Sequence, residues 1–348
     1  MESDLAIEAV NTGAAVVPPG PRRPWLVADI GGTNARFGWY DGHSAAVSHV
    51  HSVPAAAHAG PAEAAVAYLD DLRTRLGDTW QAPGAAAFAV ATAVSGDEVR
   101  FTNSGWSFSR RAAAARLGLA DLRVLNDFEA LALSLPRLAP EQWRDIPGRG
   151  AAAAQALPGA ALAVIGPGTG LGVAGLVPTA HGYVALPGEG GHATLAPADD
   201  FESALLSAAR RLHPHVSAER LLSGIGLPVL HAAVCAVRGD APSAMLSAED
   251  VVERGLAGHD AACVQALDSF CALLGSFAGS VALTLGARGG VYIGGGIVPR
   301  LGPRFFASRF RERFEAKGRF ESYLQAIPTR LIVDTLAALA GCAAALES

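Results

Sequence analysis

Near the start of the chain, apolar and polar positions alternate in short runs, which is the period expected of β-strands. Three such runs follow one another: WLVADI from Trp25, ARFGWY ending at Tyr40, and AAVSHVHSV. A glycine turn, GGTN, separates the first two, and the pair Asp41–Gly42 follows the second. Because an Asp-Gly pair between strand-like runs is a strong hairpin signal, the pattern predicts an antiparallel meander.

The period then becomes helical, because residues 61–76 carry apolar side chains three to four positions apart, at Ala65, Leu69, Leu72 and Leu76. A buried strand (AAAFAVATAV), a small hairpin ending in FTNSGWSFS, an alanine-rich helix near 110–117 and the strand LRVLN follow. The predicted order of this first half is βββαβαβ.

A second copy of the opening pattern starts at Ala161, with the strand ALAVIG, the glycine turn PGTG, the strand LGVAGLV and the strand GYVAL. An apolar stripe then predicts a long helix at about 266–285, which leads into the buried strand GGVYIGGGI. Two domains on one plan, each opening with a glycine hairpin, predict an α/β protein with a cleft that both turns face.

Length and composition narrow the possible functions. A chain of 348 residues fits two domains, and 27 basic against 32 acidic residues without a block of like charge argue against nucleic acid as a partner. The most apolar window, 158–177, has membrane length, but glycine and proline interrupt it, so we expect a buried strand, turn and strand. Residues 1–24 hold acids and end in prolines, which predicts a mobile tail rather than a secretory signal.

The cysteines and the single lysine exclude further classes of site and of protein. The four cysteines lie far apart with no C-x-x-C pair, so neither a disulfide framework nor a zinc site is indicated, and a reducing cytoplasm is expected. The chain has a single lysine, Lys317, followed by glycine. A Walker A loop, a protein kinase and a pyridoxal enzyme each need a lysine in another context. We expect Lys317 on a solvated helix.

The two glycine turns, Gly31–Asn34 and Gly168–Gly170, are candidate phosphate sites, because exposed backbone N–H groups in tight turns bind anions. Asp29, in an otherwise apolar strand, would suit a metal ion. The alternative, that both are plain hairpin turns and Asp29 caps an amide, stays open. GLGVAG from Gly170 also matches G-x-G-x-x-G, but a strand follows where a dinucleotide site needs a helix.

Three other segments carry polar residues. Asn126 and Asp127 end a buried strand and start a helix, so Asp127 is either an N-cap or a base that takes a proton from a substrate hydroxyl. Glu189 and His192 lie on a loop rich in glycine. Glu219 alone reads as an exposed helix residue, and His213 and His215 as structural or solvent-facing. Such donors and acceptors suit a polyhydroxylated ligand.

Taken in order, these segments resemble the bacterial glucokinase family, ATP-dependent hexose kinases of the actin-like, ribonuclease-H-like superfamily. The resemblance rests on DIGGTNAR, TNSGW, LNDFEA, GPGTGLGVA, LPGEGGH, HVSAERLLSG and GGVYIGGGIVPR, and covers nearly everything from Trp25 onward. It implies a two-domain α/β fold with an interdomain cleft. We expect a smaller domain of residues 25–136 plus 334–348 and a larger one of 137–333.

The resemblance also implies site roles. Asp127 is expected to be the catalytic base, and Asp29 to lie near Mg²⁺. The sugar-binding residues are expected to be Asn103, Asn126, Asp127, Glu189, His192 and Glu219. The ATP-binding residues are expected to be Asp29, Gly31, Gly32, Thr33, Asn34, Gly168, Thr169, Gly170, Gly294, Gly295 and Gly296.

The implied reaction transfers the γ-phosphoryl group of ATP to the 6-hydroxyl of glucose, the first step of glycolysis. We expect a cytoplasmic homodimer that binds glucose and ATP, with neither nucleic acid nor membrane as a partner. Two alternatives stay open: a kinase for another hexose, such as mannose or fructose, and an actin-like ATPase that uses no sugar. Glu189, His192 and Asn126 would be needless in the second.

Overall fold

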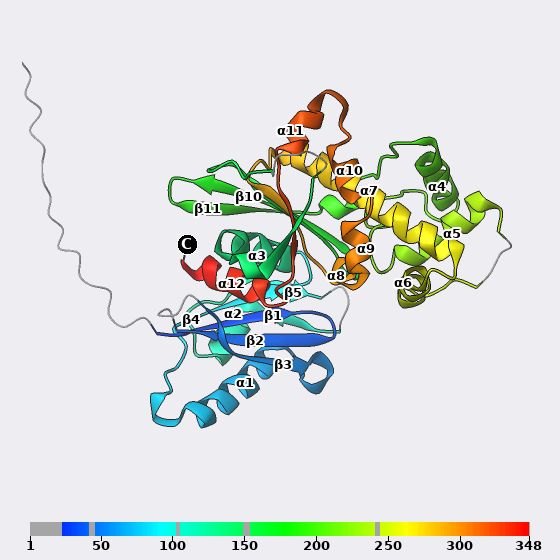
Figure 1. Ribbon diagram of the computed structural model, residues 1–348. Helices are drawn as coiled ribbons and strands as arrows, with labels where there is room; N and C mark the ends of the chain where they lie inside the picture. Colours follow the sequence, from blue (N-terminus) through cyan, green and yellow to red (C-terminus); the bar gives the residue numbers. More distant parts are fainter. Residues whose placement is uncertain (1–22, 42–45, 102–104, 149–153, 241–243, 348) are drawn as a thin grey trace, which may run out of the picture.

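The computed structural model describes residues 23–41, 46–101, 105–148, 154–240 and 244–347 (Figure 1). The expected tail, except Arg23 and Pro24, and Gly42 and Asn103 lie outside these residues. Two larger β-sheets organise the chain, one of five strands in the order β3-β2-β1-β4-β7 and one of six in the order β11-β10-β9-β12-β13-β8.

The first sheet confirms the predicted meander. Strands β1 (Trp25–Ile30), β2 (Asn34–Tyr40) and β3 (Ser48–Pro54) pair antiparallel, whereas β4 (Ala85–Val90) and β7 (Arg123–Asn126) extend the sheet in parallel. Helix α1 (Pro61–Leu76) has the predicted bounds, and β5 (Glu98–Arg100), β6 (Ser107–Ser109) and α2 (Arg110–Arg116) follow the predicted hairpin and helix.

The second sheet repeats this plan. Strands β9 (Leu162–Pro167), β10 (Leu171–Thr179) and β11 (Gly182–Gly188) form the second meander, so the apolar window is a strand, a turn and a strand, as predicted. Strands β12 (Gly290–Ile293) and β13 (Thr329–Ile332) continue in parallel, and β8 (Trp143–Ile146) closes the edge antiparallel. Because β10 contains Gly172 and Gly175 of GLGVAG and continues to Thr179, no helix opens where a dinucleotide would need one.

A group of helices extends the second sheet to one side (Figure 1). Its members are α4 (Asp200–Arg210), α5 (Leu227–Arg238), α6 (Ala248–Ala257), α7 (Ala261–Leu285), α8 (Ile297–Leu301), α9 (Pro303–Phe306), α10 (Phe310–Glu315) and α11 (Glu321–Gln325). Helix α7 starts earlier than predicted because the Asp260 carboxylate caps it. By length and composition α7 could cross a membrane, but 78% of its most apolar window is buried within the fold.

Helix α3 (Asp127–Ser134) lies between the two sheets, beside the C-terminal helix α12 (Ala337–Glu347) (Figure 1). The Phe128 ring covers Gly166 of β9 and Gly172 of β10, where added β-carbons would lie 2.4 and 1.9 Å from ring atoms. On the other side, a β-carbon on Gly341 would lie 1.7 Å from the Ala130 carbonyl oxygen. The start of α3 is therefore held by backbone approaches that only glycine allows.

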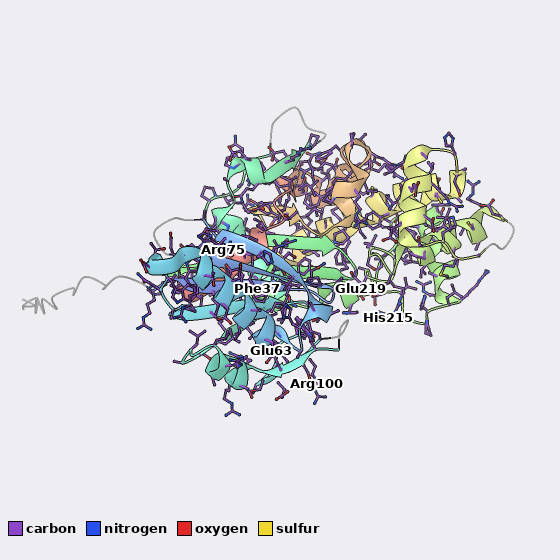
Figure 2. All side chains as sticks on the ribbon, turned by 90° about the horizontal axis from the view of Figure 1, so that it is seen from below. Phe37, Glu63, Arg75, Arg100, His215 and Glu219 are labelled. Atoms are coloured by element: carbon purple, nitrogen blue, oxygen red, sulfur yellow. The ribbon has the colours of Figure 1, made fainter. Side chains whose placement is uncertain are left out.

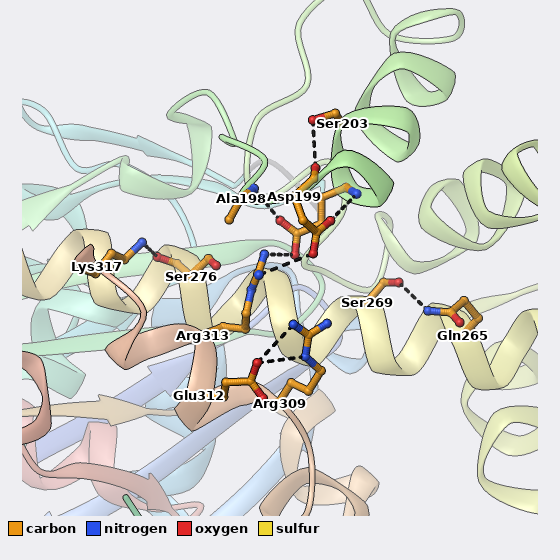
Figure 3. Close-up of polar contacts among 11 residues, drawn as sticks. Ala198, Asp199, Ser203, Gln265, Ser269, Ser276, Arg309, Glu312, Arg313 and Lys317 are labelled. Atoms are coloured by element: carbon orange, nitrogen blue, oxygen red, sulfur yellow. Dashed lines mark hydrogen bonds and ion pairs between the residues drawn. The ribbon is translucent and has the colours of Figure 1, made fainter. Parts of the chain in front are cut away.

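The prediction for Lys317 was wrong. Lys317 follows α10 and is half-buried, and its ammonium group donates to the Ser276 carbonyl oxygen at 2.8 Å (Figure 3). It also donates to the Ser280 hydroxyl at 3.0 Å, and both serines lie on α7. On α10 itself, the buried Arg313 pairs with Glu202 and Asp199 at the start of α4. These basic residues join α10 to its neighbours instead of facing solvent.

Candidate active site

The turn between β1 and β2 borders an open hollow of about 260 Å³. Its lining consists of Asp29, Gly31, Gly32, Thr33, Asn34, Arg36 and Ser52. The Gly31 N–H donates to the Asn34 carbonyl at 2.9 Å, and a β-carbon on Gly31 would have only that oxygen nearby, at 3.5 Å. The turn thus leaves room beside its backbone for an anion.

Arg36 is a site residue that the sequence analysis missed. It faces Asp29 across the β1–β2 ladder, with a guanidinium nitrogen 3.9 Å from the carboxylate and 2.7 Å from the Thr335 carbonyl, to which it donates. The signal was available, because pairing through the GGTN turn places these two residues opposite each other. Arg36 adds a positive charge to the hollow, which the absence of a Walker lysine had left without one.

The second turn, Gly168–Gly170, is tied to the segment around Glu219. Its Gly168 and Thr169 carbonyls accept from the Gly224 and Ile225 amides at 2.7 and 3.3 Å. A Glu219 carboxylate oxygen accepts from the Leu171 N–H at 2.9 Å, and a β-carbon on Gly170 would lie 2.5 Å from that same oxygen. Glycine at 170 therefore makes room for the Glu219 side chain.

Glu189, His192 and Glu219 come together at the first residues after β11 (Figure 2 labels Glu219). The two ring nitrogens of His192 lie 3.9 Å from carboxylate oxygens of Glu189 and Glu219 respectively. Glu189 and His192 are 68% and 61% exposed, whereas Glu219 is 19% exposed. The reading of Glu219 as an exposed helix residue is wrong, because it lies in a turn. His215 is exposed, as predicted, and bonds Thr194 at 3.0 Å.

The residue that caps α3 is Asn126, one position before the Asp127 considered for that role. Asn126 is the N-cap of α3, since its side-chain oxygen accepts from the Phe128 N–H at 2.9 Å and its amide donates to the Thr92 carbonyl at 3.2 Å. The N-cap reading of Asp127 is therefore wrong, and Asp127 is the first helical residue. One donor and one acceptor of Asn126 remain for a ligand.

The Asp127 carboxyl is set up to exchange a proton near neutral pH. Its pKa is raised to about 7, chiefly by burial and then by the negative charge of Asp29, with a smaller contribution from Glu189 and the Phe128 N–H opposing the rise. Asp29 lies near the end of β1, just before the first turn, and Glu189 lies on the loop beside the second. A general base works best with a pKa near the working pH, so this group can accept a hydroxyl proton.

Asp29 also has a raised pKa, chiefly from burial, with the Arg36 charge opposing it. The Asp29 and Asp127 carboxylates repel each other in this half-buried site. A hard divalent cation, which prefers oxygen ligands, would relieve that repulsion. The Asp29 carboxylate, in a site with a second carboxyl nearby, therefore has the chemistry that suits a cation such as Mg²⁺.

The Gly294–Gly296 segment connects β12 to α8 beside the second turn. The Gly294 N–H donates to Ile165 at 2.8 Å, and a β-carbon on Gly295, whose φ is +77°, would lie 2.4 Å from the Pro167 carbonyl oxygen. Gly296 caps α8 and has open space where a β-carbon would be. This segment therefore reaches the end of β9 and leaves one face free for a ligand.

The chain is similar to known sugar kinases over almost its whole length. A glucokinase of Aromatoleum aromaticum is 49% identical over 325 residues, which are 93% of this chain and 95% of that protein. The crystal structure of a glucokinase from an Antarctic psychrotroph matches with a TM-score of 0.84 at 38% identity, covering 93% of this chain and 99% of that one.

A more distant structure, a ROK family glucokinase from Streptomyces griseus in complex with glucose and AMPPNP, shares the fold with a TM-score of 0.56 at 17% identity, over 92% and 98% of the two chains. The chain also matches bifunctional proteins of Burkholderia, and it spans about half of their length. The two-domain actin-like α/β fold predicted from the resemblance is confirmed. Because the glucokinase family model matches residues 26–348, the chain belongs to the glucokinase family.

Proposed function

We infer that this chain is a glucokinase, which transfers the γ-phosphoryl group of ATP to the 6-hydroxyl of glucose. Family membership supports the reaction, and the glucokinase names of relatives support the sugar. The observation that carries the chemistry is the pKa of the Asp127 carboxyl, which is about 7. Asp29, next to the proposed phosphate turn, and Glu189, on the proposed sugar loop, both contribute to raising it.

In the proposed mechanism, Asp127 accepts the proton of the sugar 6-hydroxyl as that oxygen attacks the γ-phosphorus. Phosphoryl transfer has a loose transition state, so positioning and charge stabilisation do most of the catalysis. Backbone N–H groups of the two glycine turns hold the phosphates, and Arg36 stands beside the first turn. Mg²⁺, held by Asp29, would neutralise phosphate charge when bound.

The sugar would lie against Asn126, Glu189, His192 and Glu219. Glu219 has one carboxylate oxygen bonded to Leu171 and the other facing His192, which leaves it positioned to accept from a hydroxyl. Glu189 and His192 are exposed and can close over the ligand. The role of Asn103 rests on the resemblance alone.

The remaining assignments are also proposals. We place residues 25–136 and 334–348 in a smaller domain and 137–333 in a larger one, which agrees with the packing of Leu339 and Cys342 of α12 against the first sheet. The adenosine is placed at Gly294–Gly296. A homodimer in the cytoplasm is the expected state of the enzyme.

A coupled assay over glucose, mannose, fructose and no sugar tests the function. We expect ADP release only with a hexose and the highest kcat/KM for glucose. Turnover that is indifferent to sugar would favour an actin-like ATPase, and a higher kcat/KM for mannose or fructose would reassign the substrate.

A matched pair of variants tests the sugar loop. Glu189→Gln exchanges one acceptor for a donor and should raise the KM for glucose by roughly five- to hundredfold, while the KM for ATP stays near wild type. Glu249→Gln makes the same change at an exposed carboxylate on α6 and should alter neither. Unchanged glucose kinetics in Glu189→Gln would remove this loop from the sugar site.

A further inference from the structure

Three potential metal ligands meet where α5 packs against the start of α7 (Figure 1). His231, Asp260 and Cys263 each present one ligand atom, and these atoms lie within 4.8 Å of one another. The His231 side chain is buried on α5, Cys263 is fully buried on α7, and Asp260 is half-buried. Nothing in the proposed kinase chemistry uses them.

Local structure brings these groups together. The Asp260 carboxylate caps α7 by accepting from the Ala262 and Cys263 amides, both at 3.0 Å, so the Cys263 thiol starts the helix beside it. Leu230 and Val234 of α5 belong to the same apolar core as Ala266 of α7. This packing fixes the two helices so that His231 faces the capped end of α7.

Cys235 is a fourth candidate ligand, but its sulfur does not lie within 4.8 Å of all three other ligand atoms, so it would have to move toward them when an ion binds. It lies one turn after His231 on α5, half-buried, with its sulfur 3.6 Å from the Nε2 atom of His231. In a tetrahedral zinc site, with bonds of about 2.3 Å to sulfur and about 2.0 Å to nitrogen, these two atoms would be roughly 3.5 Å apart. The observed separation therefore already suits two ligands of one ion.

We propose that His231, Cys235, Asp260 and Cys263 form a structural zinc site that joins α5 to α7. Two thiolates, one imidazole and one carboxylate form a set that suits zinc, whereas magnesium and calcium need oxygen ligands. All four positions come from the protein, which is typical of a structural site. The half-buried Asp260 and Cys235 provide the path by which an ion enters.

In the metal-free chain, the candidate ligands differ in charge. Hydrogen bonds from backbone N–H groups, chiefly that of Cys263, lower the pKa of Asp260, so its carboxylate is negatively charged without a metal. Burial raises the pKa of the Cys263 thiol to about 12 and lowers that of His231. Zinc would bind the neutral imidazole and displace one proton from each thiol into solvent.

Helical spacing explains why the sequence analysis indicated no zinc site. His231 and Cys235 are four residues apart on one helix, and Asp260 and Cys263 are three apart at the start of another. Each pair shares a helix face, but neither has the C-x-x-C form by which zinc sites are recognised.

Metal content tests the proposal independently of kinase activity. The full chain, purified without a metal-affinity step and equilibrated with micromolar zinc, should hold about one zinc per chain by mass spectrometry of the metal. Asp260→Asn keeps an equally good N-cap and should therefore fold, yet it should weaken zinc binding at least about tenfold. Cys263→Ser should weaken it at least about a hundredfold.

Cys271→Ser is the matched control, because it makes the same change at a fully buried cysteine farther along α7 and should keep the zinc. Cobalt in place of zinc should give a thiolate charge-transfer band that Cys263→Ser loses. A folded wild-type chain that stays free of zinc, or equal zinc binding in wild type, Asp260→Asn and Cys263→Ser, would overturn the proposal.

Discussion

The two glycine turns look alike in sequence but differ in their surroundings. The first, Gly31–Asn34, faces a hollow, and a β-carbon on Gly31 would meet only the turn's own backbone. The second, Gly168–Gly170, is bonded through its carbonyls to the next segment and leaves no space at Gly170 beside the Glu219 carboxylate. The first turn is open at Gly31, whereas the second is open at Gly168 but packed against the protein at Gly170.

This difference separates two uses of the same motif. Glycine in the first turn leaves space for a ligand, whereas Gly170 leaves space for a side chain of the protein itself. Because Glu219 also faces His192, the second turn couples the proposed phosphate site to the proposed sugar site. Changes in the first turn should affect one substrate, and changes in the second should affect both.

The largest effect is expected at Asp127, whose carboxyl is influenced by Asp29, just before the first turn, and by Glu189, beside the second. Asp127→Asn should lower kcat by roughly 10²–10⁴-fold, because the general base is lost, and should leave glucose affinity within about tenfold. Steady-state kinetics and calorimetry measure both. Asp121→Asn, an exposed change just before β7, is the control, and turnover of Asp127→Asn above about a tenth of wild type would contradict the role.

The same variant should be more stable than wild type at pH 8. The folded-state pKa of about 7 lies above the ordinary value of 3.8, so the stability contribution of Asp127 is present at low pH and is lost as the pH rises through 7. Removing the charge should raise the free energy of unfolding by about 1 to 4 kcal/mol at pH 8. In urea unfolding, the difference in the free energy of unfolding between wild type and Asp127→Asn should shrink toward pH 4. A stability gain that is the same at every pH would contradict the raised pKa of Asp127.

A pair of alanine substitutions tests the two turns directly. Gly170→Ala displaces the Glu219 carboxylate and should raise the KM for glucose about tenfold, the loss of roughly one hydrogen bond, as well as the KM for ATP. Gly31→Ala has room at its β-carbon and should change only the KM for ATP. If Gly31→Ala raised the KM for glucose as much as Gly170→Ala, the distinction between the turns would fail.

The smallest effect concerns pH. The acid limb of kcat/KM should fall below a pKa near 7, because protonated Asp127 cannot act as a base. Asp29→Asn removes a neighbouring negative charge and should move that limb to lower pH by less than about one unit. Glu249→Gln, a distant carboxylate change, should leave the limb in place, and an unmoved limb in Asp29→Asn would show that the two carboxyls do not interact.

Local patterns predicted the elements well, because strand and helix periods depend on neighbouring residues. Helix α1 and both meanders follow the alternation of apolar positions. The N-cap reading of Asp127 failed, because Asn126 before it is also a residue type that caps helices and the pattern cannot separate adjacent positions.

Contacts between distant segments account for the other errors. Glu219 reaches a backbone amide 48 positions away in sequence, and Lys317 bonds atoms of α7 about 40 positions earlier. No local period contains such information. The resemblance supplied an expected role for Glu219, because family members share the folded arrangement, but it supplied no expectation for Arg36 or for the cluster at His231.

The Phe128 ring over Gly166 and Gly172 limits how this protein can evolve. A larger residue at either glycine would meet the ring, and a smaller residue at 128 alone would leave a void next to the helix that carries Asp127. A single change at any of these three positions therefore gives a less stable protein. Among relatives of this chain, the three positions should be replaced together or not at all, which an alignment of diverged members can reveal as covariation.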